Sequence, residues 1–483
     1  MNRFRFGCDR WAFGGRPQDQ RRVILRRGGE PGGGWGAGLA AAAFFAAFLA
    51  GCAAYHPKPL DGERLDSALA VPDNVTLAQE AARLRHPRIP PIVLDFSKPL
   101  TGKELGVIAV LVNPELKALR AEEGVAEAQV FRAGLLPDPR FSFGLDHPLN
   151  GTPDLVNASN AGLGWDLARV IFREAERRIA ERDRARIRYD VAWREWLAAN
   201  QVRLLAERAA YLGKREQVAR RAAEAAARIL EITRRNLERG DVKIDEFGLR
   251  QTAYLDAEDR ALSLARDLEK TWQELNRRLG FPPGRTTPVV ATALAEPSFR
   301  DAGTLFAEAR GQRLDLIALQ AGYATQEERF SLEVLRQFPS FTLGVSRARD
   351  TSDIRTIGFT VGLDLPLWNR NRGGIAVARA TRERLYAEYV SRLHGVRADI
   401  AELSADLERI GGQRAVLARE LPELERAEKT MRDAVTNGDV TLLAYEAVRS
   451  TLLDKRLVLL SLEQAAAEQR VALQLAGGAP WNP

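Results

Sequence analysis

The chain of 483 residues is poor in cysteine, methionine and histidine, and long apolar runs are scarce. Its two cysteines, Cys8 and Cys52, both lie near the N-terminus. A chain cleaved before Cys52 keeps one cysteine and forms no intrachain disulfide. No stretch of 18 apolar residues follows the run 39–50, which excludes a membrane-spanning helix there. If such a chain crosses a membrane, it must do so with strands.

Motifs for metals and for common enzymatic chemistry are also missing. The four histidines are scattered along the sequence and form no local zinc motif. They are His56, His86, His147 and His394. Met431 is the only methionine after residue 51, which argues against a methionine relay for soft metals. There is no HExxH or GxSxG, and the GxG of 162-GLGW-165 lies in a strand pattern. We expect no enzymatic activity, no metal and no cofactor.

Positive charge is concentrated at the N-terminus. The formal net charge is +7, and residues 1–51 contain eight arginines and three acids. The rest of the chain carries 63 basic and 61 acidic side chains, a net charge of +2. This balance does not indicate a basic surface for nucleic acid, so no nucleic-acid partner is expected.

The N-terminal segment resembles a bacterial export signal. Four arginines between residues 21 and 27 precede the apolar run 39–50, which has the length of a signal h-region. The run ends in 49-LAGC-52, which resembles the lipobox of lipoproteins. In that signal the cysteine receives a diacylglyceryl group and becomes the mature N-terminus. A free cysteine in an apolar stretch is the alternative. We interpret residues 1–51 as a lipoprotein signal peptide and Cys52 as the lipidation site.

The rest of the chain contains two copies of one pattern. Three pairs of segments match in the same order at offsets of 200 or 198 residues. They are 114-PELKAL-119 with 314-LDLIAL-319, 139-PRFSFGL-145 with 339-PSFTLGV-345, and 240-GDV-242 with 438-GDV-440. Matches in one order at nearly one offset indicate an internal duplication.

Each copy contains a pair of alternating segments, expected as strands at about 139–168 and 339–367. In 356-TIGFTVGLDL-365, apolar residues alternate with small or polar ones. A period of two predicts a strand with one apolar face and one small or polar face. Such a strand suits a membrane barrel, but a soluble sheet with one wet face has the same pattern.

Very long helices are expected after each strand pair. Residues 172–238 contain one glycine and no proline, and at 1.5 Å per residue they would extend about 100 Å. Residues 374–436 predict a second such helix, with a kink at Pro422. Each turns at Gly-Asp-Val and returns, which gives helical hairpins at 172–279 and 374–475. Apolar positions in the first helix are spaced like a coiled-coil seam. They are Val202, Leu205, Ala209 and Leu212.

Together with the duplication and the lipobox, five segments make the chain resemble the TolC-like outer-membrane efflux proteins, also called outer-membrane factors. The segments are 100-LTGKELGVIAVLVNPELKALRAEEGVAEAQV-130, 133-AGLLPDPRFSFG-144, 239-RGDVKIDEF-247, 363-LDLPLWNRNRGG-374 and 437-NGDVTLLAY-445. Closed membrane barrels need at least eight strands, and each chain supplies four. The resemblance implies a mainly α fold with a membrane β part, in which a homotrimer forms a 12-stranded β-barrel continuous with a 12-helix periplasmic α-barrel.

The resemblance also implies a domain organisation. The parts are a signal peptide at 1–51, a lipidated linker at 52–99, a first repeat at 100–281, an equatorial linker at 282–300, a second repeat at 301–478 and a tail at 479–483. The equatorial linker and the C-terminus would help to form a girdle around the helices.

The two Gly-Asp-Val turns are candidate functional sites. Glycine supplies the left-handed position that ends a helix, and the following aspartate is expected to N-cap the returning helix. The resemblance implies that both turns form the periplasmic tip, where the pore closes and an adaptor docks. The candidate residues are Arg239, Gly240, Asp241, Val242, Asn437, Gly438, Asp439 and Val440.

A selective acidic ring is a further candidate at the tip. Relatives place acids on the returning helix six residues after the tip glycine, and Glu246 fits that position in the first copy. The second copy has Ala444 at that position and Ala447 three residues later. An acidic ring from this copy would therefore require Glu446 or Asp439.

The resemblance implies the outer-membrane channel of a tripartite efflux system, lipid-anchored in the outer membrane and extending into the periplasm. Its partners would be a periplasmic adaptor, an inner-membrane transporter of the resistance-nodulation-division or ATP-driven type, and outer-membrane lipid. The conduit of a type I protein secretion system is one alternative. A non-conducting periplasmic lipoprotein scaffold is another, although it leaves the strand pairs unexplained.

Overall fold

The structure is a computed structural model that describes residues 53–292 and 300–481. The chain divides into two compact units, residues 1–68 and 69–483. In the first unit, the described part contains most of helix α2 (Gly62–Leu69). The signal peptide and the lipidation site expected at Cys52 lie outside the described residues.

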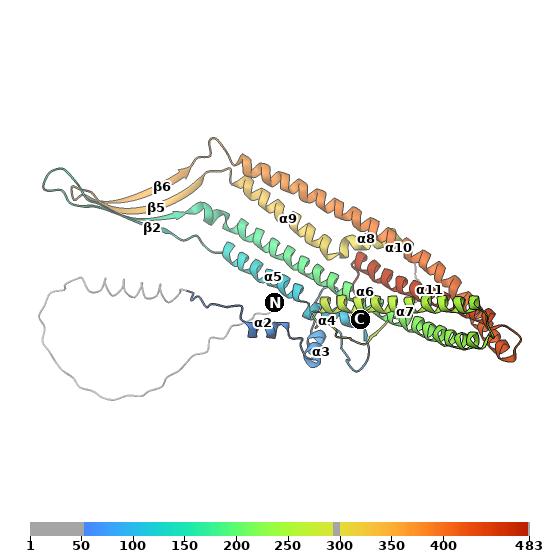
Figure 1. The fold of residues 1–483 in the computed structure, drawn as a ribbon. Helices are drawn as coiled ribbons and strands as arrows, with labels where there is room; N and C mark the ends of the chain where they lie inside the picture. The colour runs from blue at the N-terminus through green and yellow to red at the C-terminus, as the bar shows by residue number, and fades with distance from the viewer. Residues whose placement is uncertain (1–52, 293–299, 482–483) are drawn as a thin grey trace, which may run out of the picture. The chain divides into compact units, whose positions relative to one another are not determined.

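The second unit repeats a helix, a strand pair and a long helical hairpin (Figure 1). The first copy consists of α5 (Pro114–Ala133), β2 (Arg140–Asp146), β3 (Ala158–Asp166), α6 (Leu167–Arg239) and α7 (Ile244–Leu279). The second consists of α9 (Leu314–Leu335), β5 (Ser340–Arg349), β6 (Arg355–Asp364), α10 (Arg372–Asn437) and α11 (Leu442–Gly477). The remaining elements are α3 (Asn74–Ala82), β1 (Leu100–Thr101), α4 (Gly102–Val112), β4 (Val289–Val290) and α8 (Ala302–Gln312). The predicted duplication of strand pairs and helical hairpins is confirmed.

The start of α6 differs from expectation. The sequence pattern placed Leu167 in the strand, but it is the first residue of the helix, because Asp166 caps it. The Asp166 carboxylate accepts hydrogen bonds from the N–H groups of Ala168 at 3.1 Å and Arg169 at 3.4 Å. With 73 residues, α6 extends about 110 Å. In the second copy, residues 365–371 separate β6 from α10, so the two repeats join strand to helix differently.

The four long strands form one antiparallel sheet in the order β2-β3-β5-β6. The sheet joins one end of the long helices, and the α6–α7 and α10–α11 turns lie at the other end (Figure 1). Within the described chain, β2 and β6 are the edges of this sheet and each has one paired neighbour.

A compact core surrounds the middle of α6. Helix α4 is buried there, and a Cβ at Gly106 would lie 2.8 Å from the carbonyl oxygen of Ala199 on α6. The ring of Trp481 packs at a tilt against that of Trp196, with 5.7 Å between the ring centroids, and its backbone N–H donates to the carbonyl of Arg88 at 3.0 Å. The β1 strand pairs in parallel with β4, which lies in the 282–300 segment. Helix α4, near the start of the unit, and Trp481, near its end, therefore both pack against the middle of α6.

Helix α6 also connects the two repeats, because it packs against α7, α9 and α11. The four residues of the expected coiled-coil seam are all buried. They are Val202, Leu205, Ala209 and Leu212. Farther along, Ala219 and Ala223 pack with Leu264 of α7 and Leu457 of α11. Among the described helices, none is both long enough and apolar enough to cross a bilayer.

Candidate functional site

One face of the four-stranded sheet is apolar and exposed. Backbone pairing places Phe141, Leu163, Val345 and Phe359 side by side across all four strands. The next row contains Trp165, Leu343 and Val361. Most of these side chains are largely exposed, and Phe141 reaches 71% exposure. An exposed apolar area that extends over a whole sheet marks a surface for lipid or for another protein.

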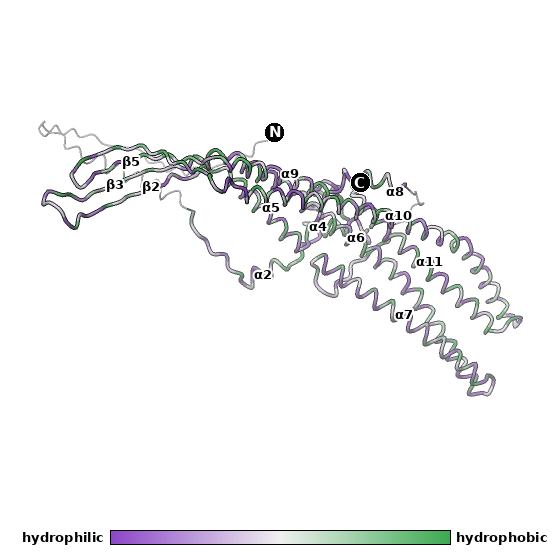
Figure 2. The backbone as a smooth tube through the Cα atoms, turned by 90° about the horizontal axis from the view of Figure 1, so that it is seen from above, coloured by the Kyte–Doolittle hydropathy of each residue, from purple (hydrophilic) through white to green (hydrophobic). Residues whose placement is uncertain are grey.

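The opposite face of the sheet carries small and polar residues. Its rows contain Ser142, Gly162, Ser346 and Gly358 in one register and Gly164, Gly344 and Thr360 in another. In the hydropathy colouring of Figure 2, hydrophobic and hydrophilic segments both occur along the strands. Two faces of this kind can separate an apolar environment from an aqueous one.

The two tip glycines adopt the left-handed conformation that the sequence predicted. Gly240 has a φ of 80° and Gly438 a φ of 81°, and each ends a long helix. Arg239 and Asn437 are the last residues of those helices and are exposed. Val242 and Val440 are partly buried. The structure brings both turns to the same end of the unit (Figure 1).

The expected capping by Asp241 and Asp439 is wrong. The N-cap of α7 is Lys243, and that of α11 is Thr441, whose hydroxyl accepts from Ala444 N–H. Both aspartates come two residues earlier, and their own N–H groups donate to carbonyls of the preceding helix at 2.9 Å. This is the backbone closure of a helix ending in left-handed glycine. Within the described residues, neither carboxylate has a hydrogen bond or an ion pair, and both residues are exposed.

The acids on the returning helices have basic partners. Glu246 lies 3.8 Å from Arg250 on α7, and Arg250 is buried. Glu446 lies 3.4 Å from Arg449 on α11. Burial raises the pKa of the Glu446 carboxyl, and the charges of Arg449 and Arg250 offset this only in part. Asp439 is therefore a better source of exposed negative charge in the second copy than Glu446.

Sequence reasoning missed a buried charge cluster where α8, α9, α10 and α11 meet. Asp315 accepts two hydrogen bonds from the Arg313 guanidinium, at 3.0 and 2.8 Å. Arg392 of α10 donates to the same carboxylate at 2.9 Å. Arg313 also donates to the carbonyl of Ala476 at 2.8 Å and lies over the Trp193 ring of α6. The only sequence signal was an acid within the apolar segment 314-LDLIAL-319.

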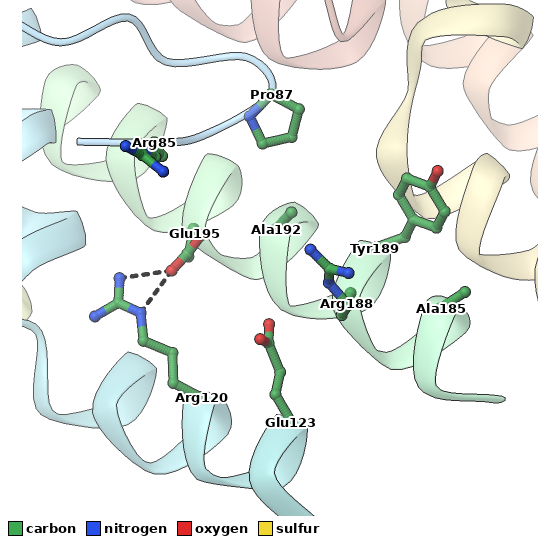
Figure 3. A pocket seen from close by; sticks show the side chains of 9 residues that line it. All are labelled: Arg85, Pro87, Arg120, Glu123, Ala185, Arg188, Tyr189, Ala192 and Glu195. Atoms are coloured by element: carbon green, nitrogen blue, oxygen red, sulfur yellow. Dashed lines mark hydrogen bonds and ion pairs between the residues drawn. The ribbon is translucent and has the colours of Figure 1, made fainter. Parts of the chain in front are cut away.

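A cavity of about 520 Å³ lies between α5 and α6 (Figure 3). Arg120 of α5 donates to Glu195 of α6 at 2.6 Å on its wall. Next to it, buried His86 accepts from the N–H groups of Arg88 and Ile89 through Nδ1, so Nε2 carries the proton and donates to Ala192 O at 2.9 Å. Burial lowers the pKa of His86. These contacts fasten α5 and the 86–89 turn to α6, which is a structural role.

Part of the chain matches a known protein family, and most of it shares a fold with solved structures. Residues 305–479 match the family model described as outer membrane efflux protein. A search of curated sequences returned no match. The fold resembles the CmeC outer membrane channel of Campylobacter jejuni, with a TM-score of 0.66 and 15% identity over 78% of this chain and 85% of that one.

Two further solved structures have the same fold. The open state of the MtrE outer membrane channel of Neisseria gonorrhoeae gives a TM-score of 0.64 and 17% identity, over 78% of this chain and 89% of that one. The outer membrane protein VceC of Vibrio cholerae gives a TM-score of 0.64 and 14% identity, over 79% of this chain and 97% of that one. The resemblance to the TolC-like outer-membrane efflux proteins is therefore confirmed, by the family match for the second repeat and by the fold for most of the chain.

Proposed function

We propose that this relative of the TolC-like outer-membrane efflux proteins is the outer-membrane channel of a tripartite efflux system. It would conduct small molecules or metal ions from a pump and an adaptor to the exterior. The observation that carries the proposal is the two-faced sheet, in which exposed apolar rows cover one face and glycine, serine and threonine cover the other. Lipid on one side and water on the other explain both compositions.

The sheet also supports a trimer. An antiparallel sheet with two open edges leaves backbone groups unpaired, which is prohibitive within lipid. Pairing β6 of one chain with β2 of the next removes both edges, and three chains close a barrel of 3 × 4 = 12 strands. The four long helices α6, α7, α10 and α11 of each chain would then supply the 12 helices of a periplasmic tube.

The test of this proposal combines mass and conductance. We expect detergent-extracted full-length protein to have the mass of three chains and to form ion-conducting pores in planar bilayers. A protein that stays monomeric in native-like lipid would contradict the closed barrel. A trimer that never conducts would instead favour the alternative of a periplasmic lipoprotein scaffold.

The partners follow from the same proposal. A periplasmic adaptor would dock at the tip turns, and an inner-membrane transporter of the resistance-nodulation-division or ATP-driven type would supply energy. A type I secretion conduit is the second candidate, because the channel does not itself define the cargo. Loss of a secreted protein from the medium after gene disruption, without increased sensitivity to toxic small molecules, would favour secretion.

A lipid anchor at Cys52 is proposed from the lipobox 49-LAGC-52. We expect Cys52→Ala to abolish incorporation of radioactive palmitate and to leave the signal peptide uncleaved at that site, because the thiol is the only acceptor of the diacylglyceryl group. Wild-type protein labelled in parallel is the control. Labelling that persists in the variant would show that the anchor is elsewhere or absent.

The exposed tip aspartates predict an effect on ion selectivity. A trimer would bring six such carboxylates to one end of the tube, where a negative field favours cations. Because neither aspartate caps a helix through its side chain, Asp241→Asn with Asp439→Asn should change charge and leave the turns folded. We expect a lower cation-over-anion preference in bilayer recordings. Unchanged selectivity in a folded double variant would place these carboxylates away from the ion path.

A further inference from the structure

The apolar face of the sheet ends in arginines beside the β5–β6 turn. On β5, Val345 is followed on the same face by Arg347 and Arg349. On β6, the neighbouring positions of that face are Ile357, opposite Arg347, and Arg355, opposite Arg349. The face thus changes from purely apolar rows to a row with one arginine and then to a row with two.

The arginines are arranged to leave positive charge available. Arg349 and Arg355 both reach the Asp353 carboxylate, at 2.6 and 3.8 Å, so one acid serves two guanidinium groups. Arg347 is exposed and, within the described residues, has no ion pair. The other acid of the turn, Asp350, accepts the N–H groups of Ser352 and Ile354 at 2.9 Å. It is therefore engaged in shaping the turn.

The position of these arginines matches the boundary of a membrane. The apolar positions of β6 and the residue after it run from Ile357 to Leu365, about 27 Å along the strand at 3.4 Å per residue. With a tilt of about 40°, that length spans about 20 Å of height, close to the apolar band of about 25 Å in outer-membrane barrels. The row of Arg349 and Arg355 lies one step beyond this band, where outward arginines are tolerated.

We propose that Arg347, Arg349 and Arg355 bind the phosphate groups of a phosphorylated glycolipid in the outer leaflet. This inference rests on the proposed function, because the helices must point to the periplasm for the β5–β6 turn to face outward. Arginine binds phosphate through paired, charge-assisted hydrogen bonds. Its aliphatic stem can also remain among the apolar rows while the guanidinium reaches the headgroups.

Removal of the Asp353 carboxylate would strengthen the binding of phosphate by these arginines. This carboxylate occupies two of the three guanidinium groups, so it competes with phosphate for them. Its backbone has a positive φ of 61°, a conformation that asparagine tolerates. Asp353→Asn should therefore keep the turn and raise the affinity for phosphate, a gain that damage to the fold would not produce.

The experiment measures lipid retention by native mass spectrometry of the full-length detergent-extracted protein. The probes are lipid A with two phosphates and the same lipid after enzymatic dephosphorylation. Wild type should retain the phosphorylated form on the order of tenfold better. The triple variant Arg347→Gln, Arg349→Gln and Arg355→Gln should lower this ratio to about one, and Asp353→Asn should raise it.

Arg140→Gln is the matched control, because Arg140 is exposed, belongs to the same sheet and lies on the small-residue face, paired with Gly164. It should keep the wild-type ratio. Equal retention of both lipids by wild type, or an unchanged ratio in the triple variant, would overturn the inference. Displacement of the lipid by millimolar inorganic phosphate would identify a site for the free ion and also overturn it. Bilayer conductance is recorded for the same samples. If they conduct but the lipid ratio is not as expected, only the lipid site is wrong. The proposed channel would be contradicted only by the loss of all conductance.

Discussion

Val361→Arg is expected to prevent stable insertion of the protein into the outer membrane. Val361 is the middle of the exposed apolar positions between Ile357 and Leu365, and it lies opposite Leu343, which pairs with Trp165. An outward arginine at the midplane of a barrel costs about 2–4 kcal/mol, or about 6–12 kcal/mol for a trimer. We expect at least about a tenfold loss of trimer from the outer-membrane fraction, measured by immunoblotting of unheated samples.

Thr360→Arg is the matched control for this variant. Thr360 is the adjacent residue of the same strand, but it lies on the opposite face, paired with Gly344, which has no side chain. The control trimer should assemble and show altered single-channel conductance, because a charge enters the bore. If the apolar face were instead wet, arginine at exposed Val361 would be harmless. Equal assembly of both variants would therefore contradict the lipid-facing assignment.

The two faces and the tip turns were predictable because they depend on local sequence. Side chains of a strand alternate between its two faces whatever packs against it. The alternation around Val361 therefore predicted which residues lie on the apolar face and which on the small-residue face. A left-handed residue after a long helix favours glycine for local steric reasons, so Gly240 and Gly438 were identified correctly. The assignment of Asp241 and Asp439 as caps was wrong because the helices begin two residues later than expected. The N-cap position of a helix can move along the chain by one or two residues, because an additional extended residue in the preceding turn costs little free energy.

The junction at Arg313 was not predictable from local patterns. Arg392 is 77 residues from its partner Asp315, and Ala476 is 163 residues from its partner Arg313. The duplication held a clue, because the equivalent residue of the first repeat, Asn113, donates to the carbonyl of Arg278 at 2.8 Å. Arg278 and Ala476 are themselves 198 residues apart, the offset of the repeats. Both copies thus tie the start of a short helix to the end of the returning helix.

The second repeat replaces this neutral contact with a charged one. Asn113 caps α5 through its own side chain, by accepting from the N–H of Leu116 at 3.1 Å. Arg313 cannot accept a hydrogen bond, and α9 has no side-chain cap at its start. Asp315 accepts the Leu316 N–H at 3.0 Å and neutralises the buried Arg313. The junction therefore depends on one carboxylate.

Asp315→Asn is the prediction that tests this dependence. The side chains of Arg313 and Asp315 are only 4% and 9% exposed, so neutralising the acid leaves a buried guanidinium without its counter-ion. Removing one partner of a buried pair costs about 3–5 kcal/mol. We expect a clearly lower midpoint of thermal unfolding at pH 7, followed by far-ultraviolet circular dichroism. Asp454→Asn is the control, because Asp454 forms an exposed pair with Arg260 that is worth about 1 kcal/mol or less.

The pH dependence of this effect distinguishes a lost charge from a general defect in packing. Burial alone would raise the pKa of Asp315, but hydrogen bonds and charge from Arg313 and Arg392 outweigh it and hold the pKa below its ordinary value of 3.8. A lowered pKa in the folded state contributes stability above the ordinary pKa and loses it as the pH falls further. The difference between wild type and Asp315→Asn should therefore be constant from pH 7 to about pH 5 and shrink below about pH 4. A difference that stays the same down to pH 3 would show that the asparagine disturbs packing, and that the carboxylate charge does not hold the junction.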